Sequence, residues 1–256
     1  MSFWAAWQFL TTLPSPCRRG HDLTGLGRAA GFFPVVGLVL GLVLFGLDRL
    51  LGLLLPAVLV NILLVIAIIV LTGALHLDGL IDTCDGLAVK SSAADRLMIM
   101  TDARVGGFGV VGGCCLILLK FVSLAALPSG LRSAALLLTP VLSRWGMVYA
   151  ISAFPAARKE GIGWAVKQGV DRPGIALATL VALVVAMLLL GWWGAALVGA
   201  TWLVVLAVSR YLCSLLGGLS GDSYGAVNEL GEVAVLILAS AMGRLGIAAW
   251  LGPLLR

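Results

Sequence analysis

Charged side chains are scarce in this chain of 256 residues: 11% are Asp, Glu, Lys or Arg, whereas 61% are hydrophobic and the mean hydropathy is +1.11. Soluble globular domains carry about 25% charged and about 45–50% apolar residues. The chain therefore has too little polar surface to cover a water-soluble sphere, which excludes a soluble protein with a large core. We expect an all-α fold, a polytopic integral membrane helical bundle.

A signal peptide and a cysteine framework are also lacking. The N-terminus, MSFWAAWQFLTTLPSP, has no basic region before its apolar residues. We expect residues 1–28 to form an N-terminal interfacial or cytoplasmic segment whose aromatic rings favour the membrane interface. The five cysteines form no CxxC pair and no zinc-like cluster, so we interpret them as small hydrophobic residues. With no repeats or linkers, residues 1–256 read as a single membrane-embedded domain.

Long apolar runs are abundant. A membrane helix needs roughly 20 mainly apolar residues, and a scan of the chain gives seven candidates: 29–51, 56–75, 107–127, 131–152, 174–192, 194–214 and 226–250. The stretch 175–208 is too long for one span, and Gly191-Trp192-Trp193-Gly194 supplies a turn and two interfacial aromatics. We therefore divide it, which gives about seven transmembrane helices; without the division there are six.

The polar residues are distributed unequally between the two sides of these spans. Most of the 17 lysines and arginines fall on the N-terminal side, so the positive-inside rule predicts a cytoplasmic N-terminus. Asp48 is the one acidic residue expected on the outer side. We therefore expect an almost bare outer half and a reaction at the cytoplasmic face.

The stretch HLDGLIDTCDG, residues 76–86, raises a question because three aspartates follow a long uncharged run. If the helix continues through it, Asp78, Asp82 and Asp85 share one face. Like charges on one stripe repel, and Mg²⁺ would balance them while keeping water and phosphate oxygens in its shell. This pattern favours a diphosphate substrate, although three solvated loop aspartates remain the alternative. His76 is a candidate general base or a hydrogen-bond partner.

A second motif, DRLMIMTDARVGGFGVVGG, spans residues 95–113. Asp102 is a candidate metal ligand and Arg104 a candidate clamp for phosphate oxygens. Gly106 and Gly109 introduce a membrane helix whose N–H groups could bind phosphate, although such glycines also allow close helix packing.

The third motif, GGLSGDSYGAVNELGE at 217–232, reads as a glycine-rich loop and the start of the last helix. Asp222 could bind metal, and Glu229 could be catalytic, because ionisable groups in a span are costly. Lys120 and Arg144 lie within spans, so Lys120 should face the bundle interior and pair with an acid. Both cations are candidate phosphate ligands, but a structural role for each is equally open.

Several motifs together resemble those of the cobalamin synthase family, and the resemblance covers most of the chain. It is carried by FLTTLPSP (9–16), FFPVVGLVLG (32–41), HLDGLIDTCDGL (76–87), DRLMIMTDARVGGFG (95–109), SRW (143–145), RKEGIG (158–163) and GGLSGDSYGA (217–226). The family pattern usually differs at five of the positions within these motifs, namely Thr12, Ala103, Gly107, Ser220 and Tyr224. Those differences concern substrate contacts rather than the class of reaction.

This resemblance implies a bacterial inner-membrane enzyme that requires Mg²⁺ and works at the cytoplasmic face. Such an enzyme joins adenosylcobinamide-GDP to α-ribazole, or to its 5′-phosphate, and releases GMP. The implied partners are these substrates and the lipid bilayer, with no nucleic acid, and a homo-oligomer is compatible with the sequence. In that scheme Asp82 is the leading metal ligand and catalytic candidate.

Two other classes of function remain as alternatives. A CDP-alcohol phosphotransferase or an aromatic prenyltransferase would also use aspartates and Mg²⁺, but the first has a D-G-x₂-A-R motif that is absent here, and the second usually has two dense aspartate motifs. A transporter should place polar groups through the whole membrane thickness, whereas the outer half is expected to be nearly bare.

Overall fold

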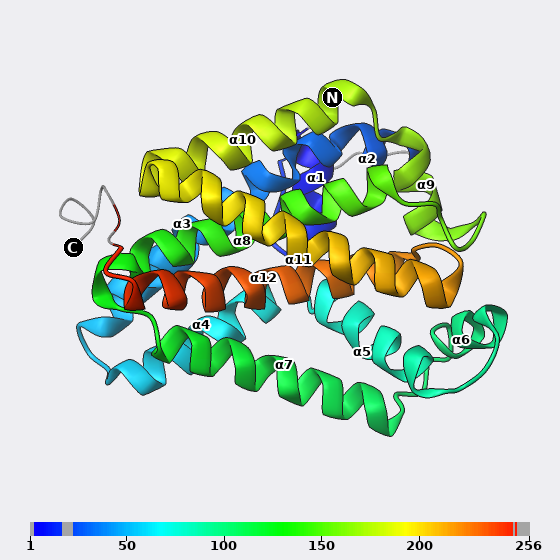
Figure 1. Cartoon of the computed structure of the whole chain (residues 1–256), viewed down its shortest axis with the longest axis horizontal. Coiled ribbons are helices and arrows are strands. Elements are labelled where there is room, and N and C mark those ends of the chain that lie inside the picture. Colours follow the sequence, from blue (N-terminus) through cyan, green and yellow to red (C-terminus); the bar gives the residue numbers. More distant parts are fainter. Residues whose placement is uncertain (1–2, 17–22, 248, 250–256) are drawn as a thin grey trace.

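The computed structural model describes residues 3–16, 23–247 and 249, and the part of the chain that it describes is helical with one isolated β-bridge. Long helices run along the horizontal axis of Figure 1, with α6 and α9 at the right-hand end and the C-terminal end of α12 at the left-hand end. The helices are α1 (Phe3–Leu10), α2 (Leu23–Ala29), α3 (Phe33–Gly52), α4 (Ala57–Leu71), α5 (Leu75–Ala88), α6 (Ala93–Ile99), α7 (Gly107–Ala125), α8 (Ser129–Ala153), α9 (Gly161–Gly169), α10 (Arg172–Leu190), α11 (Trp192–Leu216) and α12 (Gly221–Arg244).

Six of these helices are long and apolar enough to cross a membrane, and the bent pair α4–α5 raises the number to seven. The expected polytopic helical bundle is therefore confirmed. The division of 175–208 is confirmed as well, because Gly191 at φ +59° separates α10 from α11. The predicted start of the last span at residue 226 is wrong, since α12 begins at Gly221 with Ser220 as its N-cap.

The core is organised around α8, which packs against α3 on one side and α12 on the other. Glycines set the close approach of α3 to α8: a Cβ at Gly41 would lie 2.8 Å from the Leu137 carbonyl oxygen. Small residues at such crossings are typical of membrane helix pairs, because they let backbones meet without a side chain between them. Almost every side chain of the middle of α8 is buried, which makes it the central helix of the bundle.

The helical path is interrupted between α4 and α5, and the axes of the two helices meet at 90°. Gly73 and Ala74 both adopt positive φ, at 60° and 57°, which ends the hydrogen-bond ladder of α4. The main-chain N–H of Thr12 donates to the Leu71 carbonyl at 2.8 Å and its hydroxyl donates to that of Val70 at 3.1 Å. These bonds satisfy carbonyls that a helix terminus leaves without partners. The span predicted at 56–75 therefore ends at Leu71, and the aspartate motif lies on a separate helix, α5.

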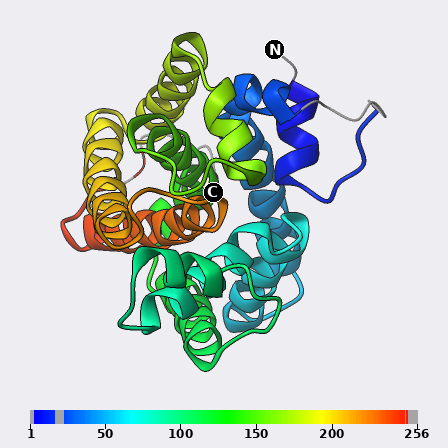
Figure 2. The same cartoon turned by 90° about the vertical axis from the view of Figure 1, so that its right-hand side faces the viewer.

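Figure 2 views the right-hand end of Figure 1 and shows α1 and α2 beside α9. A Cβ at Gly27 of α2 would collide with the backbone of α9, so these elements touch directly. The short helix α1 spans Phe3–Leu10, and its Ala5, Ala6 and Leu10 are buried. The N-terminal segment thus forms one wall of the end of the bundle that carries the aspartates.

Candidate active site

The three aspartates of the central motif lie on the single helix α5, at the i, i+4 and i+7 spacing predicted from the sequence. Asp78 is exposed, whereas Asp82 and Asp85 are half-buried. Although α5 does not continue α4, the shared face survives because the break falls before Leu75. The stripe of carboxylates therefore exists in the folded chain.

A fourth carboxylate, Asp222, joins this stripe from the first turn of α12. Gly79 of α5 brings the two helices together, because a Cβ there would lie 2.9 Å from the Cα of Asp222. The negative charges of Asp78, Asp222 and Asp85 all act on Asp82, which places Asp82 at the centre of the group. Asp222 was expected in a flexible loop, and its position in a capped helix is a correction.

Asp85 has a hydrogen-bonding role of its own. The N–H of Gly106 donates to Asp85 Oδ2 at 2.7 Å, and the N–H of Gly109 donates to Oδ1 at 2.8 Å. Both glycines were predicted to bind phosphate at the start of α7. In the structure a carboxylate occupies that helix terminus instead, which is favourable for the same electrostatic reason.

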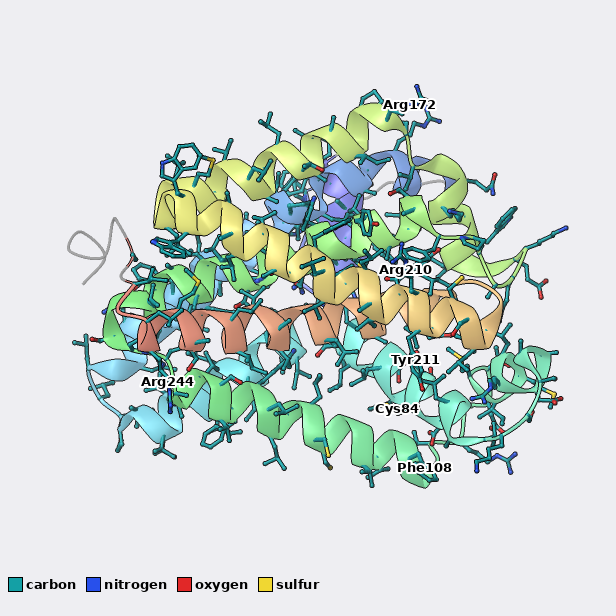
Figure 3. The ribbon with its side chains drawn as sticks, in the orientation of Figure 1. Cys84, Phe108, Arg172, Arg210, Tyr211 and Arg244 are labelled. Atoms are coloured by element: carbon teal, nitrogen blue, oxygen red, sulfur yellow. The ribbon has the colours of Figure 1, made fainter. Side chains whose placement is uncertain are left out.

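Asp102 and Arg104 form a separate, exposed pair on the turn before α7. The Arg104 guanidinium donates to Asp102 at 3.1 and 2.8 Å, and these hydrogen bonds lower the pKa of Asp102 to about 2. The Arg104 side chain is 89% exposed. Phe108, two residues into α7, is also exposed near this end (Figure 3). Asp102 is bonded to Arg104 and is not among the charges acting on Asp82.

Sequence reasoning did not select Arg158 as a site residue, although it begins the RKEGIG motif. The parallel bridge between Ala156 and Leu219 holds the segment before α9 against the segment before α12. The Arg158 side chain donates to the Leu97 carbonyl oxygen, and its positive charge acts on Asp222. Arg158 and Asp222 also line one cavity of about 230 Å³. A pairing of segments so far apart in sequence leaves no local sequence signal.

Lys120 and Arg144 lie deeper in the bundle, in a buried ion network. Lys120 Nζ is 2.6 Å from Glu229 Oε2 and 2.6 Å from Glu232 Oε2, and Arg144 donates to Glu232 Oε1. The prediction that Lys120 faces the interior and pairs with an acid is confirmed. Its partners are the glutamates of α12 rather than the aspartates of α5. The two cations and two glutamates balance in charge, and the predicted catalytic role of Glu229 and phosphate-binding roles of Lys120 and Arg144 stay predictions.

A second charged cluster joins the C-terminal part of α3 to the starts of α4 and α8, and it contains Asp48, the one acidic residue expected on the outer side. Arg132 donates to Asp48 Oδ1 at 2.7 Å and to Asn61 Oδ1 at 2.7 Å, and Asp48 is buried. Because Asp48 and Arg132 neutralise each other, we interpret this cluster as a structural contact that joins α3, α4 and α8.

The cluster of carboxylates suits a Mg²⁺ ion that takes some of its ligands from water and substrate. Among the described residues, no three of His, Cys, Asp and Glu are arranged to hold a metal ion by themselves. Mg²⁺, however, is usually bound by one or two carboxylates together with waters and substrate phosphates. Asp78 and Asp82 supply oxygen donors, and Asp222 beside them adds a further negative charge, so a cation shared with substrate suits this cluster.

Comparison with known proteins gives a consistent result. The family model described as cobalamin-5-phosphate synthase matches residues 2–240. The chain is 38% identical to an adenosylcobinamide-GDP ribazoletransferase of Geotalea daltonii, over 94% of this chain and 97% of that protein. It is 39% identical to one of Synechococcus elongatus, over 91% and 93%, and 36% identical to one of Desulforamulus reducens, over 90% and 92%. No solved structure matches the chain.

Proposed function

The chain belongs to the cobalamin-5-phosphate synthase family, and we propose that it catalyses the reaction for which its relatives are named, with adenosylcobinamide-GDP as donor and α-ribazole, or its 5′-phosphate, as acceptor. It is a multi-pass membrane transferase of cobalamin synthesis. The single observation that carries the site assignment is the close approach at Gly79 of α5, which carries Asp78 and Asp82, to the first turn of α12, which carries Asp222. A diphosphate donor brings several negative charges, so its site must supply positive charge and precise positioning.

In this proposal a ribose hydroxyl oxygen of the acceptor attacks the phosphorus on the cobinamide side of the donor diphosphate. A new phosphorus–oxygen bond forms there, the bond from that phosphorus to the bridging oxygen breaks, and GMP leaves with the bridging oxygen. The hydroxyl proton passes to Asp222, whose carboxylate is next to Asp78 and is oriented by Ser220 at 3.3 Å. No other reactant is needed to balance this step.

Asp78 and Asp82 would hold Mg²⁺, which when bound polarises phosphoryl oxygens and neutralises charge that develops on them. Arg158, half-buried beside Asp222, would bind a non-bridging oxygen of the diphosphate. Arg104 is exposed and free to turn from Asp102 toward a second oxygen. Asp85 fixes α7 against α5 through Gly106 and Gly109, and in this role it aligns the stripe instead of reacting.

We further propose that this end of the bundle faces the cytoplasm of a bacterial inner membrane. The support is the charge distribution: α6 and the loops around α6 and α9 carry Lys90, Arg96, Arg104, Arg158 and Lys159, and basic residues favour the cytoplasmic side. Both substrates are polar and would reach the aspartates from water without crossing the bilayer.

The test is GMP release by the purified chain in detergent, given both substrates, with and without Mg²⁺. We expect Mg²⁺-dependent release that Asp82→Asn lowers by orders of magnitude, because the central carboxylate is lost while the shape is kept. Asp95→Asn is the matched control, since Asp95 is an exposed residue that caps α6. A well-folded wild-type protein that releases no GMP would contradict the proposed reaction, and an Asp82→Asn variant as active as the control would contradict the site.

A further inference from the structure

A cavity of about 170 Å³ lies beside the aspartates and is lined by residues of α1, α3, α5, α8, α9 and α12. Asp78 and Asp222 line this cavity, and so do Gly79, Gly221 and Gly225. The reaction described above uses the carboxylates but gives no role to the cavity behind them.

The wall of the cavity is mainly apolar. It is formed by Phe9, Phe33, Met147, Ile151, Ile162 and Val166. The rings of Phe9 and Phe33 stack with centroids 5.9 Å apart, so this wall includes an aromatic pair. Such a surface suits a planar, apolar ring, which would be removed from water on binding.

Two polar groups in the wall have no partner within the protein. His76 and Tyr224 line the cavity, are 2% and 4% exposed, and leave His76 Nε2 and the Tyr224 hydroxyl without a hydrogen bond. Buried polar atoms are rarely left unpaired, because an unmet hydrogen bond costs free energy. Each of these groups can donate to a ring nitrogen. Their presence in an otherwise apolar wall indicates a ligand with few, well-placed acceptors.

The volume limits what can bind. A site for a whole drug-sized ligand occupies about 300–1,000 Å³. The cavity of about 170 Å³ is therefore sized for part of a ligand, such as one ring system, with the rest of the molecule outside its mouth. Guanine fits its chemistry poorly, because guanine carries donors and acceptors on several edges that this wall would leave unpaired.

We propose that this cavity binds the planar nitrogen heterocycle of the acceptor nucleoside, a benzimidazole-type base, and that Tyr224 turns its hydroxyl toward the base and donates to its one free ring nitrogen. The inference rests on the proposed function and adds to it the place where the acceptor base binds and is selected. With the base in the cavity, the ribose lies at its mouth, where Asp78 and Asp222 are found. The attacking hydroxyl is then next to the carboxylate that accepts its proton.

The first experiment measures binding of α-ribazole alone, without donor or Mg²⁺, to the purified full-length protein in detergent by calorimetry. We expect Tyr224→Phe to weaken this binding about two- to tenfold, the range for one lost neutral hydrogen bond. Tyr211→Phe is the matched control: Tyr211 is exposed and lines a separate apolar groove with Cys84, between α11 and α5 (Figure 3). Equal binding by the two variants and the wild type would overturn the role of Tyr224.

The second experiment fills the cavity with Met147→Phe and compares acceptors with a dimethylated and an unsubstituted base. We expect kcat/KM to shift toward the smaller base by about tenfold or more, because methyl groups in an apolar pocket give discrimination of this size. The KM for the donor should not change. Met187→Phe on the exposed side of α10 is the control. A raised donor KM with unchanged base preference would overturn the proposal.

The two experiments separate this inference from the reaction on which it rests. If wild-type protein releases no GMP but α-ribazole binds and Tyr224→Phe weakens that binding, the reaction fails and the base cavity stands. If GMP is released but neither variant changes acceptor binding or base preference, the reaction stands and the cavity assignment fails.

Discussion

Glu232 is the residue whose loss the buried ion network should tolerate least. Its carboxylate contacts Lys120 at 2.6 Å through one oxygen and Arg144 through the other, and the residue is 2% exposed. Glu232→Gln keeps the shape of the side chain but leaves two buried cations with one glutamate. The network then carries an uncompensated positive charge in the buried interior of the bundle.

The expected cost follows from that imbalance. Breaking a buried ion pair by removing one partner destabilises a protein by about 3–5 kcal/mol. At about 1.4 kcal/mol per factor of ten, the ratio of folded to unfolded protein falls between about a hundredfold and a few thousandfold. The double variant Glu232→Gln/Arg144→Met restores the charge balance, because Lys120 keeps Glu229. We therefore expect it to be more stable than Glu232→Gln alone.

Unfolding in mixed micelles, with SDS as denaturant and helicity as the readout, measures the difference. Glu160→Gln, a change of the same kind at an exposed residue, is the control and should match the wild type. A loss below about 1 kcal/mol for Glu232→Gln would refute the reasoning, since it would mean that water or another anion balances the cations.

Two further substitutions test the site: one at the contact between α5 and α12, and one at an exposed cation. Gly79→Ala places a methyl group 2.8 Å from the Asp222 carbonyl oxygen, so α5 and α12 must separate, and the rate of GMP release should fall at least tenfold. Gly199→Ala is the control: the added methyl group meets nothing within 4 Å, so the rate should not change. Arg104→Gln should leave the free energy of unfolding within about 0.5 kcal/mol of the wild-type value, because exposed ion pairs contribute little to stability. In initial-rate measurements the same variant should have a higher KM for the donor, because in the proposed site this cation binds the diphosphate.

Hydropathy and charge predicted the membrane bundle, but not its interruption. The separation of α10 from α11 was visible because Gly191 and two tryptophans interrupt the apolar run. The 90° break before α5 was not visible, because it depends on the positive φ of Gly73 and Ala74 and on Thr12, which is distant in sequence. An alanine in this conformation is held by its surroundings and leaves no mark on a hydropathy plot.

The candidate site divides in the same way. The shared face of Asp78 and Asp82 followed from helical spacing alone. Asp85 had the same spacing, but its bonds to the N–H groups of Gly106 and Gly109 depend on how α7 packs against α5. Arg158 looked like an ordinary loop cation because its neighbour Asp222 is distant in sequence. Spacing in the sequence predicts which residues share a face of one helix, but it does not predict which helices pack against each other.

The buried ion network and the carboxylate site are connected through α12. Asp222 begins this helix, while Glu229 and Glu232 further along it bind Lys120 of α7 and, through Glu232, Arg144 of α8. Because α5 and α12 cross at Gly79 and touch closely, a small slide of α12 would move Asp222 away from Asp78. Charged contacts with short distances resist such a slide more strongly than apolar ones, since apolar side chains can repack. The network therefore acts as an anchor that keeps one end of α12 in register for chemistry.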